Sequence, residues 1–507
     1  MNRSIIRWLI AICLPILSVA FGRVSFDVQS LGMDELKGTE GLAALCDGSS
    51  APFWCRLQGS ELTLITGKNA DYIFDQAGEL AALFVKQQTG QDLSGRYDLT
   101  SGQNLIPLSA PIPGAALMVN GSYQVPQEVK GSWQRQGDNE FVGSFQYRVD
   151  GLAVEKTVTV SYISHTLDLD VQVRRLKGAQ EASQIGLAVP GIGKSDDPII
   201  KLGQGDSFTA SPPEGPQANP RYLSFQTNKT RGNALILRPA PTAQGQVAGL
   251  VRPGVISLVT SLPPEAGAQA AFDVELYGGP NELVRFHQEG YLELPGLFNP
   301  NILGRLSLGL LAVLRAIHDV VGSWGLAIIV LTLLFRVLVW PLMSAQTKSM
   351  VAMQQLQPKL KALQKKYKDN KEKLQQETMK LYQEHGVNPA GGCLPMLVQM
   401  PLLLILWRVF AKFEFSEGFL WLPDLGLPDP FYILPILYVL VMIGNTLLLN
   451  RGNTQNIRQQ LLINVVFVFF IINLPSGVTL YWVVSMLVQM GQQFLIQRNM
   501  PVPAPAT

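Results

Sequence analysis

The sequence predicts a membrane protein with two parts, a bundle of six transmembrane α-helices and a periplasmic all-β sandwich domain. The first observation is composition. Of the 507 residues, 47% are hydrophobic and 15% are charged, and the mean hydropathy is +0.18, so the chain is too apolar for an ordinary soluble protein and too long for one domain. The second is the crowding of apolar segments into the last third of the chain. The third is a long stretch before them in which short apolar runs alternate with turn residues.

Composition also excludes several classes of function. The chain has 40 Lys and Arg against 38 Asp and Glu, a formal charge of +2, which argues against a DNA-binding surface built on net charge. Four cysteines are too few for a disulfide framework, and the four histidines lie too far apart in sequence to indicate a zinc site. We therefore expect no metal and no DNA partner.

Six segments are candidates for membrane spans. A helix that crosses the hydrocarbon core, about 30 Å thick, needs roughly 17–25 mostly apolar residues. The first span is either an uncleaved anchor or a cleaved signal peptide, and its long apolar run favours the anchor. The fifth is either a short span from Leu461 to Leu474 or a helix that begins near Ile457. The predicted spans cover residues 1–22, 322–343, 394–412, 431–449, 459–474 and 477–496.

The distribution of charge predicts the orientation of these spans. The 344–393 loop carries nine lysines against four acidic residues, whereas the loop after Lys412 is acidic. Lysine and arginine collect in cytoplasmic loops. We therefore expect both termini and the 344–393 loop in the cytoplasm, residues 23–295 in the periplasm, and the whole chain in a bacterial inner (plasma) membrane as a multi-pass protein.

Residues 23–295 have the pattern of a β-sandwich. Val154–Ile163 and Leu167–Val173 alternate apolar and polar residues, and glycine and proline are frequent between such runs. Cys46 and Cys55 lie close together in sequence on the oxidising side of the membrane. They form either a disulfide or two buried thiols.

An amphipathic helix is predicted over residues 296–321, just before the second span. Its apolar residues recur every three or four positions, which favours a helix lying in the membrane interface over one packed against the β domain. These residues are Leu303, Leu306, Leu310, Val313, Leu314, Ile317 and Val321.

Arg336 lies near the middle of the second span, where an arginine costs about 2.5–3.5 kcal/mol to insert. The six predicted spans contain no Asp or Glu that could pair with it. We therefore predict a polar groove among the spans into which Arg336 projects. The alternative is a snorkelling arginine capped by backbone carbonyls. Amide and hydroxyl groups suited to such a groove belong to Gln399, Asn445, Asn464, Asn473, Thr479, Tyr481, Ser485 and Gln489.

The 344–393 loop is too long for a simple connector, and its apolar residues keep helical spacing on both sides of Lys368. This predicts an antiparallel helical hairpin in the cytoplasm. Its methionines and lysines suit contact with apolar chains and with anionic lipid or RNA, although a solvated hairpin without a partner is the alternative. The candidate contact residues are Met350, Met353, Lys359, Lys365 and Lys366.

From about Phe298 to Arg498 the chain resembles the YidC/Oxa/Alb superfamily of membrane protein insertases. The motifs that carry the resemblance occur in the order found in that superfamily. They are Leu334-Phe-Arg336 leading to Trp340-Pro341-Leu342, Gln357-Pro358-Lys359, Val387-Asn388-Pro389-Ala390-Gly391-Gly392-Cys393, Gln399-Met400-Pro401, Trp421-Leu-Pro-Asp-Leu, Asp429-Pro430, Tyr432-Ile-Leu-Pro435 and Leu474-Pro475-Ser476-Gly477.

The resemblance implies a membrane protein insertase and chaperone without a cofactor, acting alone or with the Sec translocon on nascent membrane proteins. Arg336 would receive acidic or polar parts of the incoming chain, the spans around Trp482 would guide it into the lipid, and the hairpin would be its first docking place. The periplasmic domain would be a β-supersandwich. Many members carry a basic tail that contacts the ribosome, but this chain ends in residues 498–507 with one arginine. We therefore expect weak ribosome binding.

Two other functions remain as alternatives. Amide groups and one cation in a helical bundle also suit a small-solute transporter or channel, although the long hairpin and the lack of paired half-helices count against it. A membrane-anchored enzyme that acts on carbohydrate would rest on the β-sandwich alone, without a visible catalytic pair. We therefore expect an insertase that performs no covalent chemistry and is not an enzyme.

Overall fold

The structure is a computed structural model whose residues form two compact units. The first unit comprises Met1–Gly90 and Tyr97–Asn301, and the second comprises Gln91–Arg96 and Ile302–Thr507. The structure describes residues 54–56, 61–91, 97–106, 110, 112–137, 139–177, 184–192, 198–227, 232–240, 247–298, 300–344, 356–368, 370–384, 394–449 and 470–498.

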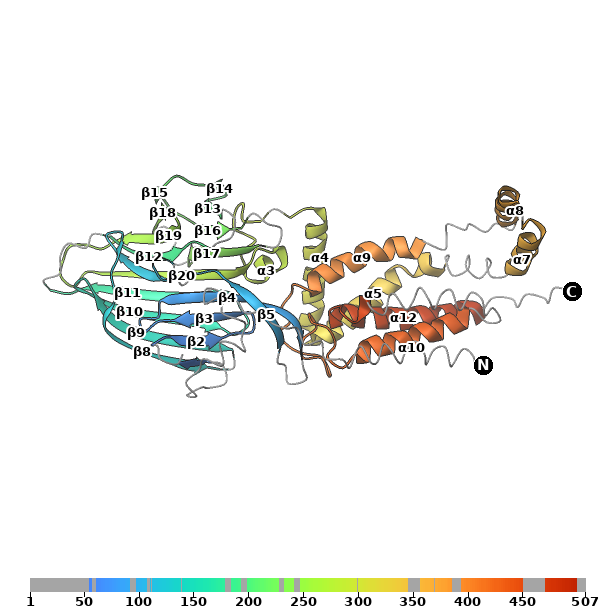
Figure 1. Ribbon diagram of the computed structural model, residues 1–507, viewed down its shortest axis with the longest axis horizontal. Coiled ribbons are helices and arrows are strands. Elements are labelled where there is room, and N and C mark those ends of the chain that lie inside the picture. Colours follow the sequence, from blue (N-terminus) through green and yellow to red (C-terminus); the bar gives the residue numbers. More distant parts are fainter. Residues whose placement is uncertain are drawn as a thin grey trace. The chain divides into compact units, whose positions relative to one another are not determined.

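Three antiparallel sheets make up most of the first unit (Figure 1). A five-stranded sheet follows chain order through β1 (Trp54–Arg56), β2 (Thr63–Thr66), β3 (Ala70–Phe74), β4 (Leu80–Gln91) and β5 (Tyr97–Asn104). A six-stranded sheet has the order β15 (Gly215–Gln217), β18 (Ala248–Arg252), β19 (Val255–Ser261), β12 (Gln184–Pro190), β6 (Ala116–Val119) and β7 (Ser122–Tyr123).

The third and largest sheet has nine strands and crosses the chain order several times. Its order is β14 (Ser207–Ala210), β13 (Ile199–Gln204), β16 (Tyr222–Gln226), β17 (Asn233–Pro239), β20 (Gln269–Pro280), β11 (Thr166–Arg175), β10 (Leu152–Ser161), β9 (Glu140–Val149) and β8 (Gln127–Gln136).

The alternation in the sequence corresponds to the two faces of this sheet. In the register of β10 and β11, Val154 lies opposite Val173 and Val158 lies opposite Leu169, and all four side chains are buried. Glu155, next to Val154 in β10, is exposed. The all-β sandwich predicted from this alternation is confirmed.

One apolar core joins the three sheets. It contains Tyr72 and Leu83 of the five-stranded sheet, Phe145 and Leu169 of the nine-stranded sheet, and Leu187 of the six-stranded sheet. Burial of large apolar side chains is the main favourable contribution to folding of such a domain. The three sheets are therefore expected to fold as one unit.

A buried polar cluster also links the sheets. Glu79, in the turn after β3, accepts hydrogen bonds from the Tyr123 hydroxyl of β7 at 2.8 Å and from the backbone N–H of Leu117 of β6 at 3.3 Å. Lys156 of β10 donates to the carbonyl of Ala115 at 2.8 Å. Burial raises the pKa of Glu79 to about 7, against the opposing effect of the Lys156 cation.

Strand β8 is an edge of the nine-stranded sheet. Most of its residues are exposed, and its pairing with β9 shifts register between Gln127 and Lys130. Within this irregularity Glu128 has a positive φ of 52°, so the edge is bent where it would otherwise be regular.

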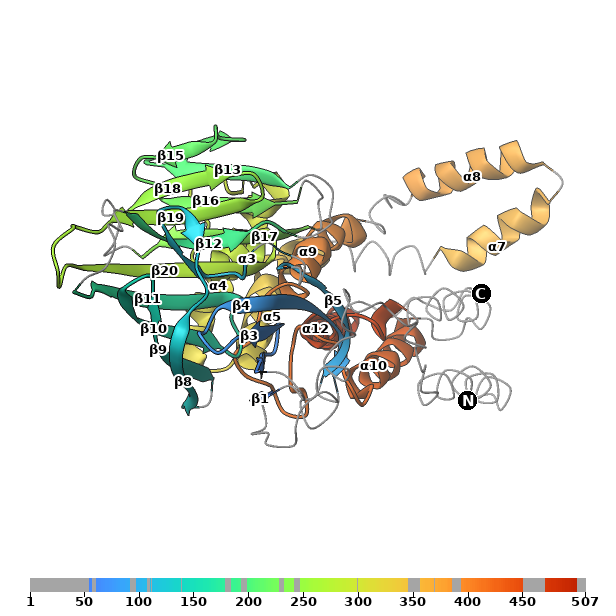
Figure 2. The same cartoon turned by 60° about the vertical axis from the view of Figure 1, so that its left-hand side comes forward.

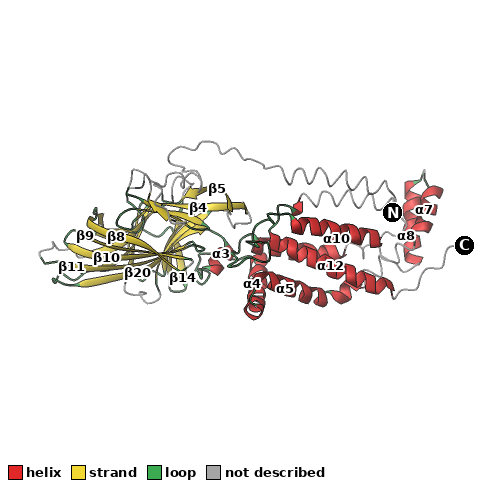
Figure 3. Cartoon of the chain, turned by 90° about the horizontal axis from the view of Figure 1, so that it is seen from below, coloured by secondary structure: helices red, strands yellow, loops and turns green. Residues whose placement is uncertain are grey.

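Helices dominate the described part of the second unit (Figure 3). They are α4 (Ile302–Val321), α5 (Trp324–Leu338), α7 (Gln357–Lys366), α8 (Lys371–Glu384), α9 (Leu394–Phe410), α10 (Ile433–Leu449) and α12 (Ser476–Arg498). A short helix, α3 (Leu283–Gln288), belongs to the first unit. Helices α7 and α8 form a hairpin (Figure 2).

Among the described residues, no one helix is both long enough and apolar enough to cross a membrane. Helices α4 and α5 meet these two criteria only when taken together, and the chain bends by 118° between them. The described helices nevertheless lie close to the predicted ranges. Helix α9 corresponds to the span predicted over 394–412, α10 to 431–449, and α12 to 477–496.

Several sequence predictions fall outside the described residues. These are the first span over 1–22, most of the fifth span with Asn464, the hairpin residues Met350 and Met353, and Cys46. Cys55 lies in β1, but the structure does not describe its side chain. The pairing of the two cysteines stays a prediction.

Candidate functional site

Arg336 is the centre of the candidate site. It lies in the last turn of α5, a helix of mostly apolar residues that begins after Ser323. The arginine is only 6% exposed, and its Nε donates a hydrogen bond to the Ser485 hydroxyl of α12 at 2.9 Å. The charged residue that the sequence singled out is therefore held between two helices.

A polar chain continues from this contact to a third helix. Tyr481 and Ser485 are one helical turn apart on the same face of α12, and Tyr481 interacts with both Ser485 and Arg336. The Tyr481 hydroxyl accepts a hydrogen bond from Gln399 Nε2 of α9 at 2.7 Å. The structure thus brings together Arg336, Gln399, Tyr481 and Ser485.

The remaining guanidinium nitrogens, Nη1 and Nη2, form no hydrogen bond or ion pair with any residue in the described part of the chain. They are also not among the fully buried polar atoms of the described residues that lack a partner. A guanidinium with two adjacent open N–H donors is suited to bind a carboxylate through two parallel hydrogen bonds. The arrangement is therefore chemically suited to bind an anion.

The start of α12 is fixed tightly. Backbone N–H groups of Ser476 and Gly477 donate to the carbonyls of Leu427 and Leu425 at 2.7 and 2.8 Å, and the Ser476 hydroxyl donates to the carbonyl of Asp424 at 3.0 Å. These contacts set the position of the helix that carries Tyr481 and Ser485.

Gly477 is required by close packing at this point. A Cβ here would lie 3.1 Å from the Leu425 carbonyl oxygen and 3.2 Å from atoms of Ile328 in α5 and Phe410 in α9. The absence of a side chain lets the backbone of α12 approach both neighbouring helices.

Other predicted groove residues lie elsewhere. Trp482 stacks on Tyr438 of α10, with ring centroids 5.8 Å apart. Thr479 is buried, and its hydroxyl donates to the Pro475 carbonyl at 3.4 Å. Asn473 is exposed in the turn before α12, and Asn445 is half-buried in α10 with an Oδ1 that has no hydrogen-bond partner among the described residues. Gln489 is half-buried in α12.

The described hairpin presents its lysines to solvent. Lys359, Lys365 and Lys366 are exposed, and helix α8 has no buried residue. An exposed basic surface of this kind is compatible with anionic partners.

One supporting carboxylate of the second unit did not stand out in the sequence as a structural residue. Asp429 accepts hydrogen bonds from the backbone N–H groups of Phe431 and Leu434, at 3.0 and 2.7 Å, at the start of α10. It also accepts one from Trp421 Nε1 at 3.3 Å. The Asp-Pro pair before an apolar run is the signal that could have identified this cap.

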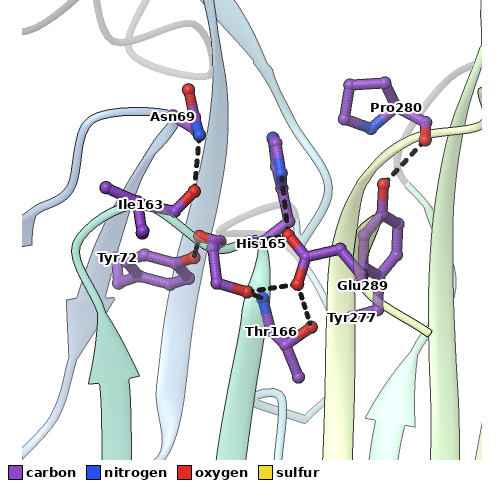
Figure 4. Close-up of polar contacts among 9 residues, drawn as sticks. Asn69, Tyr72, Ile163, His165, Thr166, Tyr277, Pro280 and Glu289 are labelled. Carbon is purple, nitrogen blue, oxygen red and sulfur yellow. Dashed lines mark hydrogen bonds and ion pairs between the residues drawn. The ribbon is translucent and has the colours of Figure 1, made fainter. Parts of the chain in front are cut away.

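A second polar cluster lies in the first unit (Figure 4). Glu289, after α3, accepts a hydrogen bond from the Ser164 hydroxyl at 2.6 Å and one from the backbone N–H of His165 at 3.3 Å. His165 is 2% exposed, and its Nδ1 lies 4.0 Å from the carboxylate. The serine bonds directly to the acid, so no histidine base lies between them as a nucleophilic triad requires. The cluster fastens α3 to the turn before β11.

Comparison with known proteins gives a consistent result for both units. The sequence pattern of the family described as 60Kd inner membrane protein matches residues 316–503. The membrane protein insertase YidC of Deinococcus radiodurans is 38% identical over 365 residues, which cover 70% of this chain and 82% of that protein. The membrane protein insertase YidC of Oleidesulfovibrio alaskensis is 29% identical over 525 residues, 91% of each chain.

The fold also has a counterpart among solved structures. The active YidC insertase crystal structure with the first transmembrane domain resolved matches with a TM-score of 0.54 and 22% identity, covering 86% of this chain and 92% of that one. At this level of identity the match supports the fold.

Proposed function

The chain belongs to the YidC family of membrane protein insertases, and from this premise we propose how its residues carry out insertion. Its function is membrane protein insertion, and its substrates are nascent membrane proteins. The relatives give no support to the alternative of a small-solute transporter or to that of a carbohydrate-acting enzyme.

In the proposed mechanism the guanidinium of Arg336 captures an acidic residue of the incoming chain. The observation that carries the proposal is its pair of open nitrogens, Nη1 and Nη2, on a side chain that is only 6% exposed. Burying a cation without a carboxylate partner is unfavourable. A transient substrate carboxylate would supply the missing partner, and its release into the aqueous side would leave the apolar segment in the lipid.

The proposed membrane arrangement follows from the sequence. Six spans, of which α5, α9, α10 and α12 are the described helices, would surround the polar groove, and α4 would lie in the interface. Its exposed apolar residues Ile302, Leu306 and Val320 support an interfacial position. Both termini would be cytoplasmic and the β domain periplasmic, in the inner membrane.

The proposed partners contact other parts of the chain. The lysines of α7 and α8 would bind anionic lipid or ribosomal RNA, and the ribosome would be bound weakly because the segment 498–507 holds one arginine. Cooperation with the Sec translocon is part of the proposal by likeness to the family. Insertion would proceed by electrostatic capture and hydrophobic release, without covalent chemistry or a cofactor.

The test compares Arg336→Ala and Arg336→Lys on two substrates that differ only in Asp or Asn in the translocated tail. We expect Arg336→Ala to reduce insertion of the Asp tail by roughly tenfold or more, since a charged hydrogen-bonded contact contributes about 1.5–3 kcal/mol. Insertion of the Asn tail should change little. Arg336→Lys should keep the charge preference and lose part of the rate. The mechanism is contradicted if the Arg336→Ala protein, present at its normal level, inserts both substrates as well as the unchanged protein does.

A further inference from the structure

We propose that Ser485 is a positioning residue that orients the Arg336 guanidinium and thereby makes the site selective for carboxylates. This inference rests on the proposed function and adds a role for a residue that the sequence had suggested as a direct substrate contact. Its basis is the 2.9 Å hydrogen bond from Arg336 Nε to the Ser485 hydroxyl.

The burial of the two hydroxyl residues argues for support over contact. Ser485 is 2% exposed and Tyr481 is 1% exposed, so neither offers an accessible surface to a passing chain. Arg336 is more exposed than either, at 6%, and its Nη1 and Nη2 form no hydrogen bond with a described residue while its Nε is occupied. The substrate would therefore meet the guanidinium and not the residues behind it.

Occupying Nε determines which edge of the guanidinium is open. A guanidinium carries five N–H donors in a planar fork. When Nε–H is bonded to Ser485, the edge formed by Nη1 and Nη2 remains, and this edge matches the two oxygens of one carboxylate. The substrate class is thus a chain with Asp or Glu beside its apolar segment, preferred over chains whose polar groups are neutral amides.

The hydroxyl of Ser485 is itself held in place. Tyr481, one turn earlier, interacts with Ser485 and receives a hydrogen bond from Gln399 at 2.7 Å. The first turn of α12 is anchored through Ser476 and Gly477. A preorganised donor fork loses less conformational freedom when it binds than a mobile one.

A double-mutant cycle tests this role with the full-length protein in lipid vesicles and the Asp-tail and Asn-tail substrates. We expect Ser485→Ala to lower the Asp-to-Asn insertion ratio about tenfold, because a hydrogen bond to a charged group is lost. In an Arg336→Lys background the same change should alter the ratio by less than about twofold, because an ammonium has no edge to orient. Ser485→Thr keeps a hydroxyl and should restore the ratio.

A matched control is Ser307→Ala in α4, which removes a buried hydroxyl that bonds the carbonyl of Leu303 in its own helix at 2.9 Å. It should leave the ratio unchanged. The inference is overturned if Ser485→Ala lowers the Asp-to-Asn ratio equally with Arg336 intact and in the Arg336→Lys background, or if it slows insertion of both tails equally. Either result would indicate a packing role for Ser485. If Arg336→Ala abolishes Asp-tail insertion while Ser485→Ala does not change the ratio, the inference fails and the proposed function stands. If Arg336→Ala is tolerated, the proposed capture mechanism itself fails.

Discussion

Glu79 and Lys156 are two buried ionisable residues that link the sheets of the β domain. Glu79 is 0% exposed and Lys156 is 1% exposed, and their hydrogen bonds reach across the sheets from the turn after β3 and from β10. Each buried ionisable group is costly when charged unless it is hydrogen bonded or paired. We therefore expect the stability of the β domain to depend on the protonation of this cluster.

This sensitivity gives a prediction for stability against pH. Burial raises the pKa of Glu79 from 4.5 to about 7, so between these values the folded state holds a proton that the unfolded state has released. Stability should therefore fall as pH rises from about 4.5 to about 7, by roughly 3 kcal/mol if only this group titrates. Thermal unfolding of the full-length protein across this range measures the slope.

The matched variants are Glu79→Gln and Lys156→Met. Glu79→Gln should flatten the slope in this window. Lys156→Met removes the cation that lowers the pKa of Glu79 and should move the window to higher pH. An unchanged slope in Glu79→Gln would assign the pH dependence to other groups.

The sequence alone predicted Arg336 as a site residue but not its hydrogen-bond partner. Its insertion cost and the lack of acids in the predicted spans identified it without a structure. Its partner Ser485 is 149 residues away, and helix periodicity does not specify which helices become neighbours or which of their polar residues meet. Asn473, chosen on the same grounds as Ser485, is exposed in a turn.

At the scale of elements, the corner between α4 and α5 is held by an aromatic and acidic contact. The ring of His318 stacks on Trp324 with centroids 3.9 Å apart, and its Nε2 lies 3.7 Å from Glu417 Oε1. The backbone N–H of Trp324 donates to the same oxygen at 3.1 Å. Gly322, with a φ of +67°, makes the turn.

Loosening this corner should affect α5 and therefore Arg336. We expect Trp324→Ala to destabilise the second unit by about 3–5 kcal/mol, as for other buried aromatic truncations, and to reduce insertion of every substrate. His318→Gln keeps a planar polar side chain and should have a smaller effect. Protease resistance measures the stability of each variant, and the insertion rate measures its activity. A loss of insertion for only some substrates in Trp324→Ala would show that the corner does more than support the fold.

Gly477 offers a second test at this scale. Gly477→Val would place methyl groups against the Leu425 carbonyl, Ile328 and Phe410, which already lie within 3.2 Å of the first added carbon. Overpacking of this kind costs about 1–3 kcal/mol. We expect a lower melting temperature and slower insertion of Asp and Asn tails alike. Gly491→Val, at a position with open space around it, is the control.

The elements themselves were largely predictable, whereas their assembly was not. Period-two alternation identified β10 and β11, and apolar runs located α9, α10 and α12 to within a few residues. The division into three sheets depends on pairings between distant strands, such as β17 with β20 and β12 with β6. Local sequence patterns do not specify which distant strands become neighbours.

For the whole molecule, the two compact units predict a separation of functions. The proposed groove residues lie in the second unit, and the β domain belongs to the first. Deleting residues 30–280 should therefore leave most insertion activity, which depletion of the native protein and complementation with the shortened one would measure. Complete loss of insertion, with the shortened protein present at normal level in the membrane, would place an essential step in the β domain.

The bent edge strand β8 has a consequence for how the protein behaves among its own copies. A regular exposed edge exposes unpaired backbone groups to which a strand of another molecule can add. In β8 the register shift beside Glu128 and the charged Lys130 interrupt that template. We therefore expect this irregularity to make the edge of the sheet a poorer template for adding a strand from another copy of the protein.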